Sequence, residues 1–151
     1  MGNLSDLSKA IAGTRVTTTA ASLPATTDAA LFTITGGPII LTAIWGEVTT
    51  VIQTQANNTK LKFNPDATGA DQDLCAVLDI SADAVGTIYS ITGTVGDAMV
   101  DDLLIGNVFL QDPILLSEGD IEIDCAATNT GAIKWGMFYI PAEAGATVAA
   151  A

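Results

Sequence analysis

SEGDIEIDCAATNTGAIKWGMFYIP, at residues 117–141, is the clearest β-pattern in the chain. Acidic and apolar residues alternate from Asp120 to Cys125, which is the period of a strand with one wet and one dry face. Apolar and aromatic side chains alternate again from Ile133 to Tyr139. The small residues Asn, Thr and Gly between the two segments tolerate the backbone angles of a tight turn. The pattern predicts a β-hairpin with an acidic first strand and an aromatic second strand.

The rest of the chain has the same character. It contains 151 residues, of which 49% are hydrophobic but only 5% aromatic, together with 14 glycines. Such a mixture of β-branched residues and turn formers is typical of all-β folds. We predict a jelly-roll-like sandwich or barrel of about eight to ten strands. Besides the hairpin, strands are expected at residues 29–35, 38–55, 60–63, 74–80, 87–92 and 108–116, while residues 97–106 form either a helical turn or two, or a strand.

The run at residues 38–55 is unusually long for one strand. Fully extended, it would span roughly 50 to 60 Å, several times the usual strand length. Gly46 lies near its middle. We therefore expect Gly46 to mark a bulge, or the strand to bend there from one sheet to the other.

The two ends of the chain differ from its middle. Residues 1–27 are expected to form an N-terminal arm, with a short helix over residues 3–12. An apolar stripe on that helix requires a partner surface, since so short a helix is marginal alone. The β domain then covers residues 28–141. The Ala-rich residues 142–151 form a tail that either lies along a neighbouring surface or is disordered.

Charge excludes several partners. Five basic residues against 17 acidic ones give a net charge of −12. A surface so acidic repels polyanions, so we expect no direct contact with nucleic acid. The apolar runs are too short for a membrane span, and the first residues lack the pattern of a secretory signal. These features predict a soluble protein made in a cytoplasm.

The residues that most enzymes need are missing. The chain contains no His, which removes the Ser-His-Asp and Cys-His arrangements and the His-ligated zinc sites. No phosphate-binding glycine motif is present either. Cys75 and Cys125 lie in apolar segments, where two lone cysteines are more often free and buried than joined in a disulfide. We therefore predict a protein that is not an enzyme and has no cofactor.

The acidic row Asp120, Glu122 and Asp124 allows two interpretations. Neighbours on one face of a strand stand about 7 Å apart, too far for all three carboxylates to bind one ion without help from another strand. A solvated strand face that resists aggregation is therefore the favoured interpretation. A structural calcium ion is the alternative.

The aromatic strand is also ambiguous. Trp135, Met137 and Tyr139 share one face with Ile133, and a mixed aliphatic and aromatic face is usually core. That face is buried either within one subunit or between subunits of a ring. A carbohydrate-stacking platform that also uses Trp45 is the alternative.

Residues 125–151 resemble the C-terminal ends of small structural proteins encoded among the head genes of tailed bacteriophages. The matching pieces are the turn at residues 128–131, the pair Lys134-Trp135, the strand end at residues 139–141 and the tail motif at residues 145–148. The resemblance implies a capsid decoration or cement protein, a non-catalytic β-rich module that forms trimers on the outside of an icosahedral shell. Its partner would be the major capsid protein, and its location the virion exterior.

From this resemblance we expect a homotrimer that cements adjacent capsid subunits. The expected capsid contacts are Leu4, Leu7, Ile11 and Arg15 in the arm, and the expected subunit-packing residues are Trp135, Met137 and Tyr139. Two other functions remain open at this point. One is a carbohydrate-binding or host-attachment module, and the other is a tail or head-completion protein.

Overall fold

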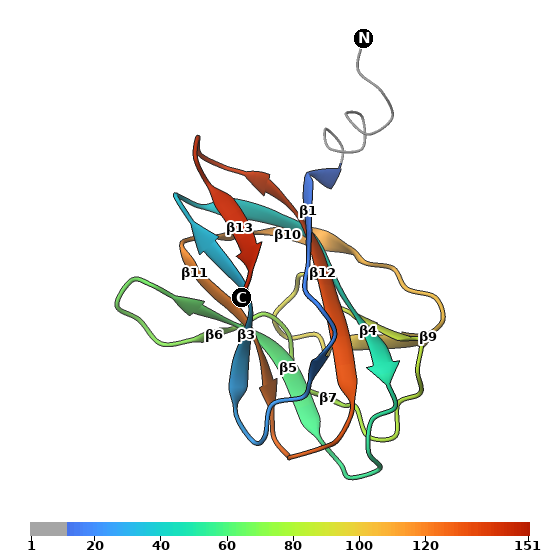
Figure 1. Cartoon of the computed structure of the whole chain (residues 1–151). Helices are drawn as coiled ribbons and strands as arrows, with labels where there is room; N and C mark the ends of the chain where they lie inside the picture. Colours follow the sequence, from blue (N-terminus) through green and yellow to red (C-terminus); the bar gives the residue numbers. More distant parts are fainter. Residues whose placement is uncertain (1–11) are drawn as a thin grey trace.

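Two antiparallel β-sheets pack face to face in the computed structural model, which describes residues 12–151 (Figure 1). The chain is thus an all-β sandwich, the first of the two architectures that the sequence predicts. No helix within the described residues is long and apolar enough to cross a membrane.

Sheet A has seven strands within residues 12–151, in the order β1-β12-β4-β8-β9, with β10 also paired to β4 and β2 to β12. Its central pair is β4 and β12, which run antiparallel along almost their whole length. The strands of sheet A are β1 (Thr14–Thr17), β2 (Ala21–Ser22), β4 (Ile39–Thr50), β8 (Thr87–Ser90), β9 (Val100–Leu103), β10 (Phe109–Leu116) and β12 (Ala132–Pro141).

Sheet B has six strands over the same residues, in the order β13-β3-β11-β5-β6, with β7 also paired to β5. The acidic strand β11 lies at its centre, between β3 and β5. The strands of sheet B are β3 (Asp28–Thr35), β5 (Asn58–Pro65), β6 (Gln72–Asp73), β7 (Leu78–Asp79), β11 (Gly119–Cys125) and β13 (Thr147–Ala150).

The predicted hairpin at residues 117–141 is wrong. Its two strands exist, but β11 belongs to sheet B and β12 to sheet A, so the segment between them crosses from one sheet to the other (Figure 1). Alternation shows which residues of a strand face the core, but it does not name the strand's partner. Turn residues fit such a crossing as well as a hairpin.

The connection between β11 and β12 is held in place by a second connection that also crosses between the sheets. The chain passes from β4 to β5 next to the β11–β12 connection, and side-chain amides bridge the two segments. Asn129 Nδ2 donates to the carbonyl oxygens of Gln53 and Gln55 at 3.2 and 2.6 Å. The backbone N–H of Ala127 donates to Asn57 Oδ1 at 3.0 Å. The side-chain amides of Asn57 and Asn129 therefore hold the two connections together, in place of the backbone hydrogen bonds that a hairpin would have formed.

Gly46 marks neither a bulge nor a change of sheet. Strand β4 runs through it, and the irregularities in its pairing with β12 fall at Thr42 and Thr49. The chain leaves sheet A only after Thr50. A β-carbon at Gly46 would lie 2.8 Å from the ring of Trp135, so the glycine makes room for an indole.

Both chain ends join the sandwich more than the sequence predicts. Strands β1 and β2 pair with β12, and β13 pairs with β3, so residues 14–22 and 147–150 belong to the sheets and not to an arm or a tail. The expected helix at residues 3–12, with Leu4, Leu7 and Ile11, falls outside the described residues except for Ala12.

Most of the other predicted strands are confirmed. Strands β3, β5, β8 and β10 occur where expected, and the ambiguous residues 97–106 contain strand β9. The strand predicted at residues 74–80 is wrong except for the two residues of β7. Leu74 and Cys75 are nevertheless buried. The apolar run there therefore indicated burial correctly, although most of its residues do not form a strand.

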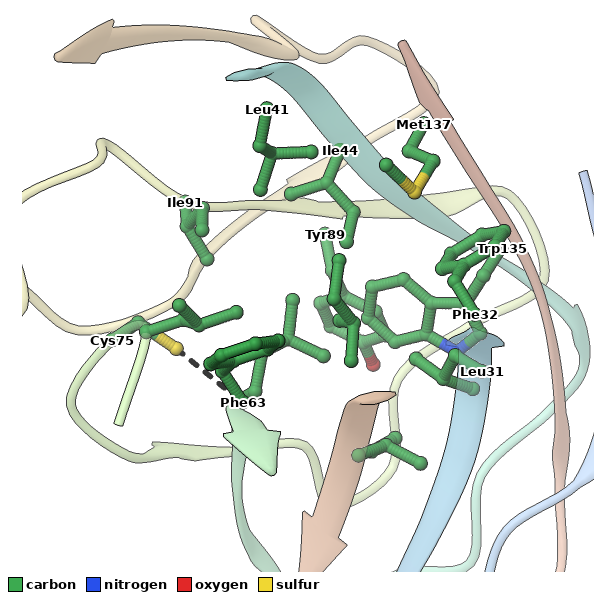
Figure 2. Close-up of a cluster of buried hydrophobic side chains, with 14 of the residues drawn as sticks. Leu31, Phe32, Leu41, Ile44, Phe63, Cys75, Tyr89, Ile91, Trp135 and Met137 are labelled. Carbon is green, nitrogen blue, oxygen red and sulfur yellow. Dashed lines mark hydrogen bonds between the residues drawn. The ribbon is translucent and has the colours of Figure 1, made fainter. Parts of the chain in front are cut away.

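The core fills the space between the sheets. Figure 2 shows Trp135 and Met137 from β12 gathered with Phe32, Ile44 and Tyr89. The rings of Trp135 and Tyr89 stack with centroids 6.4 Å apart. Cys75 and Cys125 are buried with free thiols, as predicted, and burial raises the pKa of both.

Candidate functional site

The outer face of sheet A is the main candidate for an interaction surface. Alternation along β12 turns Trp135 and Met137 into the core and Phe138 outward. Trp45 on β4 also faces outward, because its indole lies over Gly136 on the neighbouring strand. Sheet A therefore carries aromatic side chains on both faces.

Three aromatic rings meet on this outer face. Phe138 packs against Trp45 with ring centroids 5.6 Å apart, and against Phe109 of β10 with centroids 6.2 Å apart. Trp45 and Phe138 line a shallow hollow of about 400 Å³, which we call the aromatic groove, and Phe109 lies beside it against Phe138. The groove is lined by Arg15, Trp45, Ile88, Leu104, Ile105, Gly106, Val108 and Phe138.

The rim of the groove is strongly exposed. Leu104 is 74% exposed, Ile105 70% and Phe109 51%. Leu104 has a φ of 64°, in the left-handed region that leucine rarely adopts, and its N–H donates to the Gly86 carbonyl at 2.9 Å. A strained backbone that displays large apolar side chains to water is typical of a surface that another molecule covers.

The predicted subunit-packing residues are not on this surface. Trp135, Met137 and Tyr139 are each at most 5% exposed and face the space between the sheets. The prediction that they pack between subunits is therefore wrong, as is their use in a carbohydrate platform. Their burial within one subunit was the alternative interpretation of that face. Of the predicted contact residues in the described part of the chain, Arg15 does line the aromatic groove.

The sequence contained signals for the groove that its interpretation missed. Phe138 follows Ala132, Lys134 and Gly136 at the outward positions of β12 and is the first large apolar residue among them, and residues 103–105 read Leu-Leu-Ile outside any strong alternation. Both departures place apolar side chains where a solvated face needs none. Their meeting on one surface depends on sheet order, which no local pattern encodes.

The outer face of sheet B has the opposite character. Lys60 pairs with Asp73 at 2.7 Å, and Lys62 Nζ contacts both Asp28 and Asp71 at 2.8 Å. The hydrogen bond from Lys62 lowers the pKa of Asp28, and the two carboxylates raise the pKa of Lys62. Within the predicted acidic row, Asp120 and Asp124 are half-buried.

Glu122 departs from the expected solvated face. It is only 8% exposed, and Asn64 Nδ2 donates to its Oε1 at 3.2 Å. The structure therefore does not place the three acidic residues of β11 in equivalent surroundings. It brings Glu122 together with Asp28 and Asp71 from other elements, and Asp124 is the register partner of Asp28 across the β11–β3 pair.

Comparison with known proteins found no match among family models, curated proteins or solved structures. The chain's own surfaces are therefore the source of evidence about its function. The two most distinctive are the aromatic groove on sheet A and the acidic face of sheet B.

Proposed function

We propose that the protein decorates the outer surface of an icosahedral phage capsid and cements adjacent major capsid protein subunits as a homotrimer. One observation carries the proposal: the two outer faces of the sandwich are chemically opposed. Sheet A presents exposed aromatic and aliphatic side chains, and sheet B presents carboxylates. A subunit with one adhesive and one strongly hydrated face suits attachment to a surface.

Strand order supports the assignment to a jelly roll. Strands β1, β12, β4 and β10 form one layer, opposite β3, β11, β5 and β6 in the other. Within the described residues the chain changes sheet seven times, after β2, β3, β4, β7, β10, β11 and β12. Such alternation between two sheets supports a jelly roll, an architecture that recurs in viral capsid and lectin domains.

In this proposal the aromatic groove packs against a second copy within the trimer. Permanent homomeric interfaces are more hydrophobic than transient ones. A decoration protein must also stay soluble before it meets the shell, so an exposed apolar face needs to be covered beforehand. The groove and the exposed residues 103–105 satisfy both requirements.

Capsid contact falls to the N-terminal residues Leu4, Leu7 and Ile11, with Arg15 at the boundary of the sandwich. Three such segments in one trimer convert weak contacts into avidity. Binding only to the assembled shell then stabilises it against disassembly by mass action. The net charge of −12 is tolerable outside the shell and unfavourable beside packaged DNA.

Truncation tests the attachment. Deleting residues 1–11 leaves Ala12 in place, and its carbonyl accepts a hydrogen bond from Thr42 Oγ1 at 2.7 Å. We expect the truncated protein to remain folded but to bind capsids that lack it at least tenfold more weakly. A truncated protein that saturates those capsids with unchanged affinity would contradict this mode of attachment.

A carbohydrate-binding module is the second candidate, because Trp45 and Phe138 are partly exposed aromatic rings. Arg15 is the only polar side chain among the described residues that line the groove, whereas sugar sites combine aromatic faces with several polar groups. Glycan-array binding that Trp45→Ala abolishes in a folded protein would favour this candidate over decoration.

A further inference from the structure

Three carboxylates from separate parts of the chain meet on the outer face of sheet B. Asp28 begins β3, Asp71 immediately precedes β6, and Glu122 lies in the middle of β11. One oxygen from each lies within 4.8 Å of the other two. Calcium binds carboxylate oxygens at about 2.3 to 2.6 Å, so oxygens on opposite sides of one ion lie about 5 Å apart. The three side chains are thus near enough to share a single ion.

Glu122 supplies an independent reason to expect a ligand. The side chain is 8% exposed, and its Oε2 has no hydrogen-bond partner among residues 12–151. A buried carboxylate oxygen that has lost water without gaining a donor or cation is energetically costly. Because Glu122 belongs to the cluster, a cation bound there would meet this need directly.

The charge of the site favours a divalent ion. Lys62 Nζ donates to Asp28 Oδ2 at 2.8 Å and lies 2.8 Å from Asp71 Oδ2, which leaves Glu122 outside its two short contacts. Three carboxylates and one ammonium carry a formal charge of −2. A divalent ion neutralises that charge, whereas Lys62 alone leaves it uncompensated.

We propose that Asp28, Asp71 and Glu122 bind one hard divalent cation of the calcium type. When the ion binds, Lys62 gives up its short contacts with Asp28 and Asp71 but stays beside the site, so the ion and the ammonium together balance the three carboxylates. The ion ties the loop before β6 to β3 and β11, and so fastens the edge of sheet B. This site is independent of the decoration function, and its three ligands include only one of the acidic residues of β11.

Calorimetry on the full-length protein tests the site. The chain is treated with a chelator, dialysed and titrated with calcium chloride. We expect one ion per chain, with a dissociation constant of about 10⁻⁴ to 10⁻³ M, as in calcium sites that work at high calcium concentration. Calcium should also raise the melting temperature, and magnesium should bind more weakly because it demands a tighter octahedral site.

Two substitutions on β11 separate a defined site from diffuse attraction. Glu122→Gln should weaken calcium binding at least tenfold. The matched control is Asp120→Asn on the same strand face, whose register partners Thr33 and Asn64 are not ligands, and it should change binding less than twofold. If Glu122→Gln does not fold, Asp71→Asn in the exposed loop serves instead, with the same tenfold expectation. Equal losses in the β11 pair, or in Asp71→Asn and Asp120→Asn, would overturn the proposal.

Lys62→Met should change calcium affinity in the opposite direction to Glu122→Gln. Removing the competing ammonium should tighten calcium binding several-fold in the folded protein. Absence of binding by the wild-type chain at about 10 mM calcium, far above the expected dissociation constant, would also overturn the proposal and leave Lys62 as the only counter-ion of the cluster.

Discussion

The indole of Trp135 covers Gly46 of the neighbouring strand so closely that a β-carbon at Gly46 would lie 2.8 Å from the ring. On the opposite face, the indole of Trp45 covers Gly136 in the same way. The two pairs are consecutive in the register of β4 and β12. This reciprocal packing places Trp135 in the core and Trp45 in the lining of the aromatic groove. The same two strands therefore contribute to the stability of the fold and to the proposed interface.

The first prediction concerns Gly46. Gly46→Ala pushes a methyl group into the Trp135 ring within a packed core, and overpacking of this kind costs about 1 to 3 kcal/mol. We expect the free energy of unfolding, measured by urea denaturation, to fall by that amount. Gly96→Ala is the control, because no atom lies within 4 Å of a β-carbon there. Equal effects of the two changes would show that the Trp135 contact is not tight.

The second prediction concerns the groove. Leu104→Gly removes a 74% exposed side chain from the rim and relieves a backbone φ of 64° that favours glycine. We expect sedimentation to report a monomer in place of the trimer proposed for the wild type, with an unchanged circular dichroism spectrum. Because the substitution relaxes backbone strain, misfolding does not explain the loss.

Val77→Ala is the control for that experiment, since Val77 is also exposed but is not part of the groove. It should remain trimeric. A trimer that survives Leu104→Gly, or a wild-type chain that sediments as a monomer, counts against the groove as the subunit interface.

The third prediction concerns the crossing between the sheets. Asn129→Ala removes the donor to the Gln53 and Gln55 carbonyls, and loss of a buried hydrogen-bond partner costs about 1 to 3 kcal/mol. Chemical denaturation should show this decrease in the free energy of unfolding. Thr130→Ala on the same loop removes an exposed side chain and should change stability by less than about 0.5 kcal/mol. If Asn129→Ala left the free energy of unfolding unchanged, the hydrogen bonds from Asn129 to Gln53 and Gln55 would not be needed to stabilise this loop.

The fourth prediction concerns pH. Burial raises the pKa of Asp83, which accepts a hydrogen bond from Tyr89 Oη at 2.5 Å, above its ordinary value of 3.8. A raised folded-state pKa contributes stability below the unfolded value, and this contribution is lost as pH rises through the folded value. Asp83→Asn stays neutral throughout. Its melting temperature should therefore match the wild type near pH 3 and exceed it at pH 7.

Asp79 should show the opposite dependence of stability on pH, because its pKa is lowered where that of Asp83 is raised. Backbone N–H groups of Asn57 and Ser81 donate to its Oδ1 at 2.8 and 3.1 Å and lower its pKa. Its contribution is present above the unfolded value and is lost as pH falls through the folded value. Asp79→Asn should therefore be less stable than the wild type at pH 7, with a smaller difference at pH 3. Thermal melts that show the same sign for both variants would contradict these assignments.

The sequence predicted the two-sheet class and the strand faces well, because alternation and turn residues are local signals. The inward positions of β12, from Ile133 to Tyr139, follow directly from a period of two. Pairing was less predictable. The hairpin assignment failed because β11 and β12 are neighbours in sequence but take their partners from β3, β4 and β5, which lie far away along the chain.

The candidate sites depended on the same long-range order. Asp28, Asp71 and Glu122 are separated by tens of residues and meet only after β3, β5 and β11 have paired. Gly46 looked like a break in a long strand, whereas it accommodates an indole from β12. In both cases the residue types were visible in the sequence, but their neighbours were not.

The central claim is that this chain coats a capsid from outside. The most direct test is to image purified virions of a phage whose genome encodes this sequence, and to count copies of the chain per particle. The account predicts hundreds of copies, arranged as three-fold clusters on the outer surface of the shell. A dozen copies or fewer, confined to a single vertex or to the tail, or none on the particle, would contradict it.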